Sequence, residues 1–229
     1  MILAYHRINP WYKEDALTVS PGNFRRHIAY LAKYFNMPPP EKCFPGKGTS
    51  GKSAAVTFDD GFADNLWYAM AVLEDFGVRP LIFITAGYIG TAATLPRYKD
   101  LKRDRFLNWS EVKKMADCGV NFGSHALTHS HLPTLEPGLI EKEVGDSKKM
   151  IEDKTGREAE FFCYPYGDFS QKVIDAVQKA GYRGAVVTPG KRRVGATRYT
   201  IPRTGIYGHN NFFVFMIKTW KGYLAGKYC

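Results

Sequence analysis

Two adjacent carboxylates, Asp59 and Asp60, are followed by Gly61 and preceded by the apolar, β-branched run 54–58. Such a run predicts a buried strand that delivers both side chains to a loop at its C-terminal end, where catalytic groups of α/β proteins usually lie. Neighbouring carboxylates repel each other and are costly to desolvate, so the pair indicates a cation or a shared proton. Asp-Asp-Gly is also ordinary turn chemistry, and this stretch alone leaves a solvated turn open.

Two histidines, His125 and His129, follow a second predicted strand and are four residues apart. Residues at this spacing lie on one face of a helical turn, so both imidazoles can bind one metal ion. His131 lies close by in the sequence, and this crowding argues against a purely structural role. One carboxylate with two imidazoles makes an open site for zinc or a similar divalent ion. The other Asp is then free to act as a general base.

Predicted strands alternate with predicted helices along nearly the whole chain. The strands cover residues 2–6, 54–58, 80–85, 120–124, 160–164, 184–188 and 199–201. One predicted helix begins at Pro21, and four more cover 64–76, 110–118, 139–154 and 170–180. The predicted N-caps are Ser20, Asp64, Ser110 and Ser170. This alternation predicts an α/β fold with a parallel sheet or a barrel. No break in composition indicates a second domain, so we expect one domain over residues 1–229.

The chain is basic, with a net charge of +10 over 229 residues and a pI of about 9.4. This charge favours acidic partners such as nucleic acid, anionic lipid headgroups or acidic polymers. Because the basic residues are scattered rather than gathered in a stripe, nucleic acid is not an expected partner. Association with an anionic surface and the oligomeric state both stay open.

The four cysteines, Cys43, Cys118, Cys163 and Cys229, lie far apart with no C-x-x-C pair. This spacing suits reduced cytosolic thiols better than a disulfide framework or a thiolate zinc site. No stretch resembles a secretory leader, and no apolar run approaches a transmembrane segment, so we expect a cytoplasmic location.

Residues 46–53 match the phosphate-binding pattern G-x-x-x-x-G-K-[ST]. That pattern binds phosphate when a strand precedes it and a helix follows it. Here Pro45 precedes the pattern and a predicted strand follows it, so we interpret it as a chance match in a loop. A nucleoside triphosphatase built on this loop would show nucleotide affinity.

Six motifs together resemble the polysaccharide deacetylases of the NodB-homology type, carbohydrate esterase family 4, and in particular members with an N-terminal Tyr-His. They are Leu-Ala-Tyr-His-Arg at 3–7, Thr-Phe-Asp-Asp-Gly at 57–61, Trp-Ser-Glu at 109–111, Gly-Ser-His-Ala-Leu-Thr-His at 123–129, Phe-Cys-Tyr-Pro-Tyr-Gly at 162–167 and Pro-Arg at 202–203. The resemblance implies a distorted (β/α) barrel. It also implies metal-dependent removal of N-acetyl or O-acetyl groups from sugars.

The resemblance also implies a role for each motif residue. Asp59 would be the general base, and a divalent metal, zinc above all, would be bound by Asp60, His125 and His129. The metal and the backbone N–H of Tyr166 would hold the oxyanion. In members with the Tyr-His motif the histidine is the general acid, which here is His6.

Two motifs differ from those of many relatives. Such relatives carry an arginine before Pro-Tyr-Gly that steadies the base, whereas Cys163 and Tyr164 precede Pro165 here. We therefore expect Arg203 to contact Asp59 through two hydrogen bonds instead. The late Leu-x-His motif is also absent, and His209 in a similar region is a weaker candidate for the acid than His6.

The leading hypothesis is a metal-dependent hydrolase that removes acetyl groups, above all N-acetyl, from sugar units of a polysaccharide or glycan precursor. One alternative keeps the same site but acts on a small amide that is not a sugar, because such residues specify the bond better than the group around it. Another is a non-catalytic carbohydrate-binding protein. Loss of the general base would be expected in such a protein, but Asp59 is present.

Overall fold

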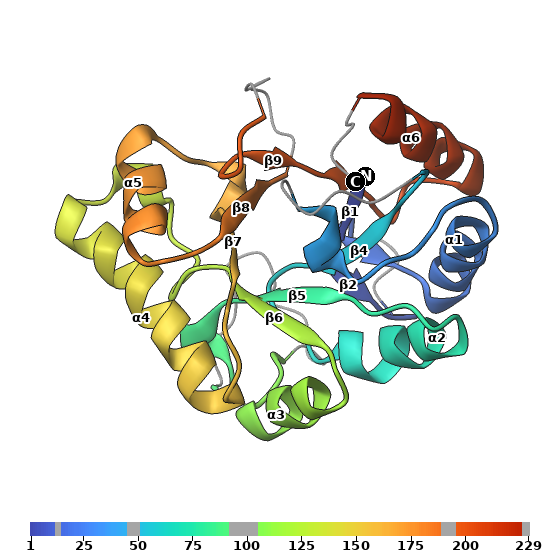
Figure 1. Cartoon of the computed structure of the whole chain (residues 1–229). Helices are drawn as coiled ribbons and strands as arrows, with labels where there is room; N and C mark the ends of the chain where they lie inside the picture. Colours follow the sequence, from blue (N-terminus) through green and yellow to red (C-terminus); the bar gives the residue numbers. More distant parts are fainter. Residues whose placement is uncertain (12–14, 45–50, 92–104, 189–195, 226–229) are drawn as a thin grey trace.

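The computed structural model describes residues 1–11, 15–44, 51–91, 105–188 and 196–225. Eight parallel strands form a nearly closed barrel with helices around its outside (Figure 1). In pairing order they are β10 (Thr204–Gly205), β1 (Ile2–Tyr5), β4 (Ala55–Phe58), β5 (Leu81–Ile84), β6 (Asn121–Ser124), β7 (Phe161–Cys163), β8 (Gly184–Val187) and β9 (Ile201–Pro202). The predicted (β/α) barrel is confirmed.

A single residue, Arg203, connects the two edge strands of this sheet. β9 ends at Pro202 and β10 begins at Thr204, although the two strands lie at opposite ends of the pairing order. The N–H of Arg203 donates to the carbonyl of Val187 in β8, with a distance of 3.1 Å. The chain therefore crosses at Arg203 from one edge of the sheet to the other, and we call this gap between β9 and β10 the seam of the barrel.

Alternate residues of each strand face the interior of the barrel. One buried cluster fills this interior and contains Ile2, Cys43, Phe44, Ala55, Leu81, Phe83, Phe161, Cys163, Val186 and Ile201. The intervening residues, such as Val56 and Ile82, belong to a second cluster that includes residues of the covering helices. Because successive residues point to opposite faces and both faces are buried, β1, β5, β7 and β8 are continuously apolar in the sequence.

The described residues contain six α-helices, which cover the outside of the barrel. They are α1 (Pro21–Tyr34), α2 (Met70–Asp75), α3 (Trp109–Asp117), α4 (Pro137–Thr155), α5 (Gln171–Lys179) and α6 (Phe212–Ala225). A separate two-stranded sheet, β2 (Arg7–Ile8) and β3 (Thr18–Val19), follows β1. Among the described residues, no helix has the length and apolar character needed to cross a membrane.

The predicted strands are all present, and their bounds differ from the prediction by one or two residues. Short 3-10 turns, η1 (Pro40–Cys43), η3 (Ala86–Tyr88), η5 (Leu132–Thr134) and η6 (Pro165–Gly167), lie in the connections. Strands β2, β3 and β10 and helix α6 were not predicted. Residues 46–50 of the phosphate-loop pattern lie outside the described residues, and β4 follows the pattern as expected.

The predicted helix caps are correct in part. The hydroxyl of Ser20 accepts from the N–H of Asn23, as expected for the N-cap of α1. Ser110 is wrong as a cap, because α3 begins at Trp109 and Asn108 caps it in a reciprocal capping box with Glu111. Ser170 occupies the N-cap position of α5 but makes no capping hydrogen bond. The predicted helix 64–76 begins as a π-helical turn, η2 (Asn65–Ala69), before α2.

The interior packing predicts a cost for a single added methyl group. A Cβ at Gly123 would lie 2.7 Å from the Phe161 carbonyl oxygen and 2.7 Å from ring carbons of Phe83. We expect Gly123→Ala to lower the free energy of unfolding by about 1–3 kcal/mol, measured by urea denaturation. In the control, Gly145→Ala, the methyl group meets nothing within 4 Å, and we expect a gain of up to about 1 kcal/mol in helix α4. Unchanged stability of Gly123→Ala would contradict this packing.

Candidate active site

The candidate site lies where β4 and β6 end. Asp59 and Asp60 follow β4, and His125 follows β6, with β5 between the two strands. The carboxyl ends of parallel strands meet at one end of a barrel, so residues far apart in the sequence come together there. Asp59, Asp60 and His125 are all buried, with exposed fractions of 3% or less.

Asp59 forms a bidentate ion pair with Arg203. Each carboxylate oxygen accepts a hydrogen bond of 2.7 Å from a different terminal nitrogen of the guanidinium. The contact expected between these two residues is therefore confirmed. Burial alone would raise the pKa of Asp59, but the charge and hydrogen bonds of Arg203 lower the pKa below its usual value. Asp59 is thus held as a carboxylate.

The guanidinium of Arg203 is held by three further side chains. It donates to the hydroxyl of Thr57 at 2.8 Å, to the hydroxyl of Thr188 at 2.9 Å and to the thiol sulfur of Cys163 at 3.0 Å. Thr57 lies in β4, Cys163 in β7 and Thr188 directly after β8. The side chain that crosses the seam is therefore bonded to strands on both sides of the barrel.

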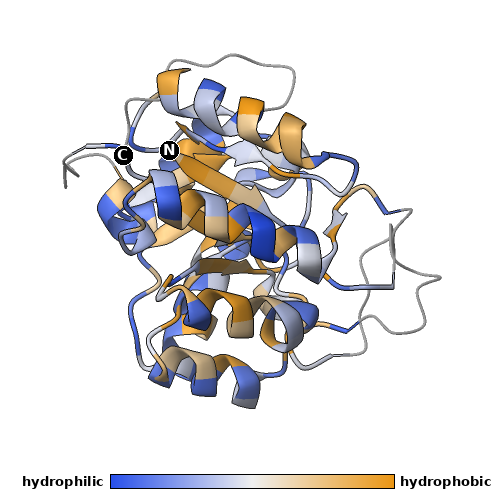
Figure 2. Ribbon diagram, turned by 90° about the vertical axis from the view of Figure 1, so that its right-hand side faces the viewer, coloured by the Kyte–Doolittle hydropathy of each residue, from blue (hydrophilic) through white to orange (hydrophobic). Residues whose placement is uncertain are grey.

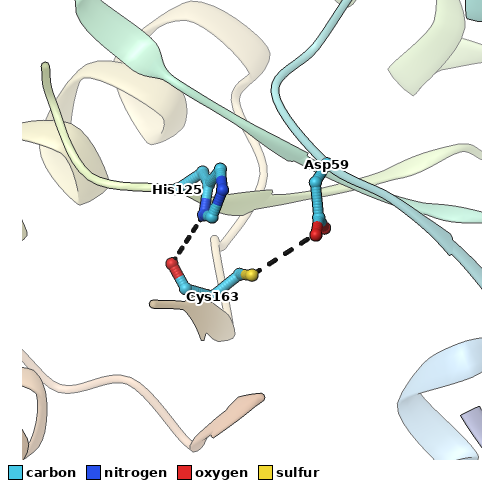
Figure 3. Close-up of side chains that lie close together, drawn as sticks. All are labelled: Asp59, His125 and Cys163. Atoms are coloured by element: carbon cyan, nitrogen blue, oxygen red, sulfur yellow. Dashed lines mark hydrogen bonds between the residues drawn. The ribbon is translucent and has the colours of Figure 1, made fainter. Parts of the chain in front are cut away.

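Cys163 connects Asp59 with His125 (Figure 3). Its thiol sulfur lies 3.8 Å from Oδ1 of Asp59, and its carbonyl accepts from Nδ1 of His125 at 2.7 Å. These three residues could offer ligand atoms to a metal ion. However, Arg203 contacts both Asp59 and the sulfur, and burial raises the pKa of the thiol. A guanidinium in contact and a neutral thiol both oppose a cation at this group.

Asp60, His125 and His129 form a second group that fits a divalent ion. Oδ1 of Asp60 lies 3.6 Å from Nε2 of His125 and 3.4 Å from Nε2 of His129. This oxygen is buried and has no hydrogen-bond partner among the described residues. A buried carboxylate oxygen without a hydrogen-bond partner is unusual and fits the binding of a cation. Together with two imidazoles it makes up the ligands of an open zinc site. The sequence prediction that these three residues lie together is confirmed.

The protonation of His125 also suits a metal ligand. Burial and the nearby His129 lower the pKa of His125 to about 4, so the imidazole is neutral at neutral pH. Its Nδ1 donates to the carbonyl of Cys163, which leaves Nε2 as the free lone pair on the side of Asp60. A backbone bond that fixes the tautomer is typical of metal-binding histidines.

The segment from His125 to His129 is an irregular loop, so the predicted helical turn is wrong. Ala126 and His129 have positive φ angles of 63° and 57°. A buried side chain from α4, Glu143, holds the loop by accepting from the N–H groups of Leu127 and Thr128, each at 2.9 Å. Sequence reasoning missed Glu143, since nothing local relates it to a loop sixteen residues upstream.

His6 follows β1 and lies beside the base. Its Nε2 is 3.8 Å from Oδ2 of Asp59. The chain after His6 is fixed by Asp64, whose carboxylate accepts from Nε of Arg7 and from the side-chain amide of Asn9, each at 2.8 Å. Asp64 occupies the predicted N-cap position, directly before η2, but its side chain makes no capping hydrogen bond. Its carboxylate is instead half of a buried ion pair.

Tyr166 lies in η6 with a positive φ of 59°. Its ring is exposed, stacks in parallel on the ring of His131 at 3.8 Å and lies edge-on to His129 at 4.6 Å. Nδ1 of His131 is 2.9 Å from the carboxylate of Asp168. These contacts place the Pro-Tyr-Gly turn beside the candidate metal ligands. The ring of His209, the weaker candidate for the general acid, stacks on the ring of Tyr207 instead.

Comparisons with known proteins identify the family of the chain. Residues 46–185 match the family model of polysaccharide deacetylase. The Bacillus subtilis protein named "Putative polysaccharide deacetylase YxkH" is 28% identical over 211 residues, which cover 90% of this chain and 70% of that protein.

Solved structures are similar along nearly the whole chain. The crystal structure of BC0361, a polysaccharide deacetylase from Bacillus cereus, has a TM-score of 0.78 at 25% identity and covers 95% of this chain and 68% of that chain. A de-N-acetylase from Aggregatibacter actinomycetemcomitans has a TM-score of 0.79 and covers 95% of this chain and 98% of that chain. At 20% identity this second likeness concerns the fold alone. The family model matches more than half of the residues of this chain, which therefore belongs to the polysaccharide deacetylase family.

Proposed function

We propose that the chain is a metal-dependent deacetylase that hydrolyses N-acetyl groups on sugar units of a polysaccharide or glycan precursor. Membership of the family supports deacetylase activity on polysaccharides. The observation that carries the proposal is the different surroundings of two adjacent carboxylates. Asp59 is bonded to Arg203, whereas Asp60 faces His125 and His129.

A divalent ion, with zinc as the best fit to the donors, would be held by Asp60, His125 and His129. When bound, such an ion polarises a carbonyl group and lowers the pKa of water. The orphaned oxygen of Asp60 and the fixed tautomer of His125 support this assignment. Nε2 of His129 likewise faces Oδ1 of Asp60, at 3.4 Å.

Asp59 would act as the general base. An ionised carboxylate has about four lone-pair sites, and two hydrogen bonds from Arg203 leave the others free to accept a proton. Water attacks the acetyl carbonyl carbon, and its proton passes to Asp59. Arg203 is a positioning residue in this scheme, because it contacts the base and fixes its orientation.

Two further groups would act on the oxygen and the nitrogen of the amide. The backbone N–H of Tyr166 would donate to the oxyanion that forms on attack. His6, 3.8 Å from Asp59, would protonate the amine nitrogen as the carbon–nitrogen bond breaks. The products are acetate and a sugar with a free amine.

Acetate release from N-acetylated glycans tests the proposal. We expect release by the wild-type chain to stop on chelation, and Asp59→Asn to lower the rate by about 10²–10⁴-fold. Asp59→Asn should still bind zinc by calorimetry, whereas Asp60→Asn should lose zinc binding, because Asp60 is the one of these two carboxylates that we propose as a ligand. Release that survives both chelation and Asp59→Asn would contradict the mechanism.

Substrates with different leaving groups can show whether His6 or His209 is the general acid. We expect His6→Ala to slow N-deacetylation by about 10²–10⁴-fold, since an amine must be protonated to leave. The same variant should lose much less activity on 4-nitrophenyl acetate, whose phenolate leaves without a proton. His209→Ala is the control and should match wild type on both substrates. Unchanged N-deacetylation by His6→Ala would refute the assignment of the acid.

A further inference from the structure

Helices α1 and α6 form a face on which exposed apolar and cationic side chains lie together. The two helices contact each other and lie side by side on the barrel (Figure 1). Eight large hydrophobic residues are exposed in the described part of the chain, and half of them lie on these two helices: Tyr34, Phe213, Ile217 and Leu224. Scattered apolar residues are normal on a surface, but such a concentration indicates an interaction site.

The apolar residues of α6 form one stripe. Phe213, Ile217 and Leu224 are 66%, 39% and 71% exposed, and their spacing of four and seven residues puts them on one face of the helix. The opposite face is buried through Phe215 and Thr219. Figure 2 looks onto these helices, with α6 along the upper edge and hydrophobic turns along its length.

α6 is packed closely against the barrel, so its outer stripe does not arise from a loosely placed helix. At Gly222 an added Cβ would meet the hydroxyl oxygen of Thr204 in β10. Nζ of Lys218 donates to the carbonyl of Gly205 and to the side chain of Asn210, each at 2.9 Å. The stripe therefore faces outward from a fixed helix.

The charge of this face is of one sign. Neither helix contains Asp or Glu, and together they carry five Lys and Arg residues. Arg25 pairs with Asp75 of α2, and Lys218 is turned inward. The remaining cations, together with the nearby Lys52, have no acidic partner among the residues that the structure places: Arg26, Lys33, Lys52 and Lys221.

Three of these cations lie against aromatic rings of the same two helices. Arg26 lies over Phe212 at 4.7 Å, Lys33 over Tyr34 at 5.3 Å and Lys52 over Trp220 at 4.9 Å. Aromatic rings beside cations, next to an apolar stripe, are the side chains that suit the boundary between lipid headgroups and acyl chains.

We propose that the α1–α6 face docks on the surface of an anionic lipid bilayer. The apolar stripe would enter the acyl boundary, and the cations would contact the headgroups. A second copy of the chain is disfavoured, because two cationic faces would repel each other. A soluble acidic polymer would use the cations but would leave Phe213 and Leu224 in water. This inference is independent of the deacetylase function.

Vesicle sedimentation with the full chain tests the proposal. Each basic residue near an anionic surface strengthens binding by roughly fivefold, so we expect at least tenfold stronger binding to phosphatidylcholine vesicles that contain phosphatidylglycerol than to phosphatidylcholine alone. Binding should weaken as sodium chloride rises from about 50 mM to about 500 mM. The variant Ile217→Ser/Lys221→Glu should bind roughly tenfold more weakly.

A matched variant on α4, Leu139→Ser/Lys142→Glu, controls for general charge and polarity. Leu139 is 53% exposed and Lys142 is also exposed, so an exposed aliphatic residue and an exposed lysine are again replaced by Ser and Glu on another helix. We expect this control to bind as wild type, and circular dichroism checks that both variants are folded. Equal losses in the two variants, equal binding to neutral vesicles, or binding only to a soluble acidic polysaccharide would overturn the proposal.

Discussion

The Asp59–Arg203 ion pair is the interaction on which the site and the barrel both depend. Arg203 is the one residue between the two edge strands, and its guanidinium is fully buried at the carboxyl end of the barrel. An uncompensated buried guanidinium would be strongly destabilising, so the carboxylate at the end of β4 and the surrounding hydroxyls are required there. The same contact that makes the buried charge tolerable keeps Asp59 ionised and oriented.

Backbone strain is concentrated at the candidate site. In the described residues the non-glycine positions with positive φ are Asp60, Ala126, His129 and Tyr166. Two of them are candidate metal ligands, and a third offers the candidate oxyanion donor. Strained residues persist where the surrounding structure fixes them, and they cluster at functional sites. The strain therefore supports the same group of residues that the distances select.

The sequence predicts the parts of this structure that are local. The apolar runs locate the strands. The Asp and His motifs come directly after two of those strands, so their place at the carboxyl end of the sheet can be predicted as well. Arg203 could be proposed because Cys163 and Tyr164 precede Pro165 here, whereas the family resemblance leads one to expect an arginine in that motif. The predicted bidentate contact agrees with the distances to Asp59.

The parts that could not be predicted depend on distant contacts. Asp64 resembles a helix cap in the sequence, but Arg7 and Asn9 approach it only in the folded chain. The loop at His129 is set by Glu143 from another element rather than by the spacing of its histidines. The hydrophobic residues of α6 face outward as well as inward, which obscures the usual helical pattern.

The most direct test of the central claim is the pH dependence of kcat/KM for Arg203→Lys, a change that keeps the buried charge but removes the two-point contact. Arg203 lowers the pKa of Asp59, so a weaker contact must raise it. Because the base acts as a carboxylate, the account predicts that the variant loses activity at a higher pH than wild type as the pH falls. Profiles of the same shape, with the rate of the variant uniformly lower, would contradict the claim that Arg203 sets the state of the base.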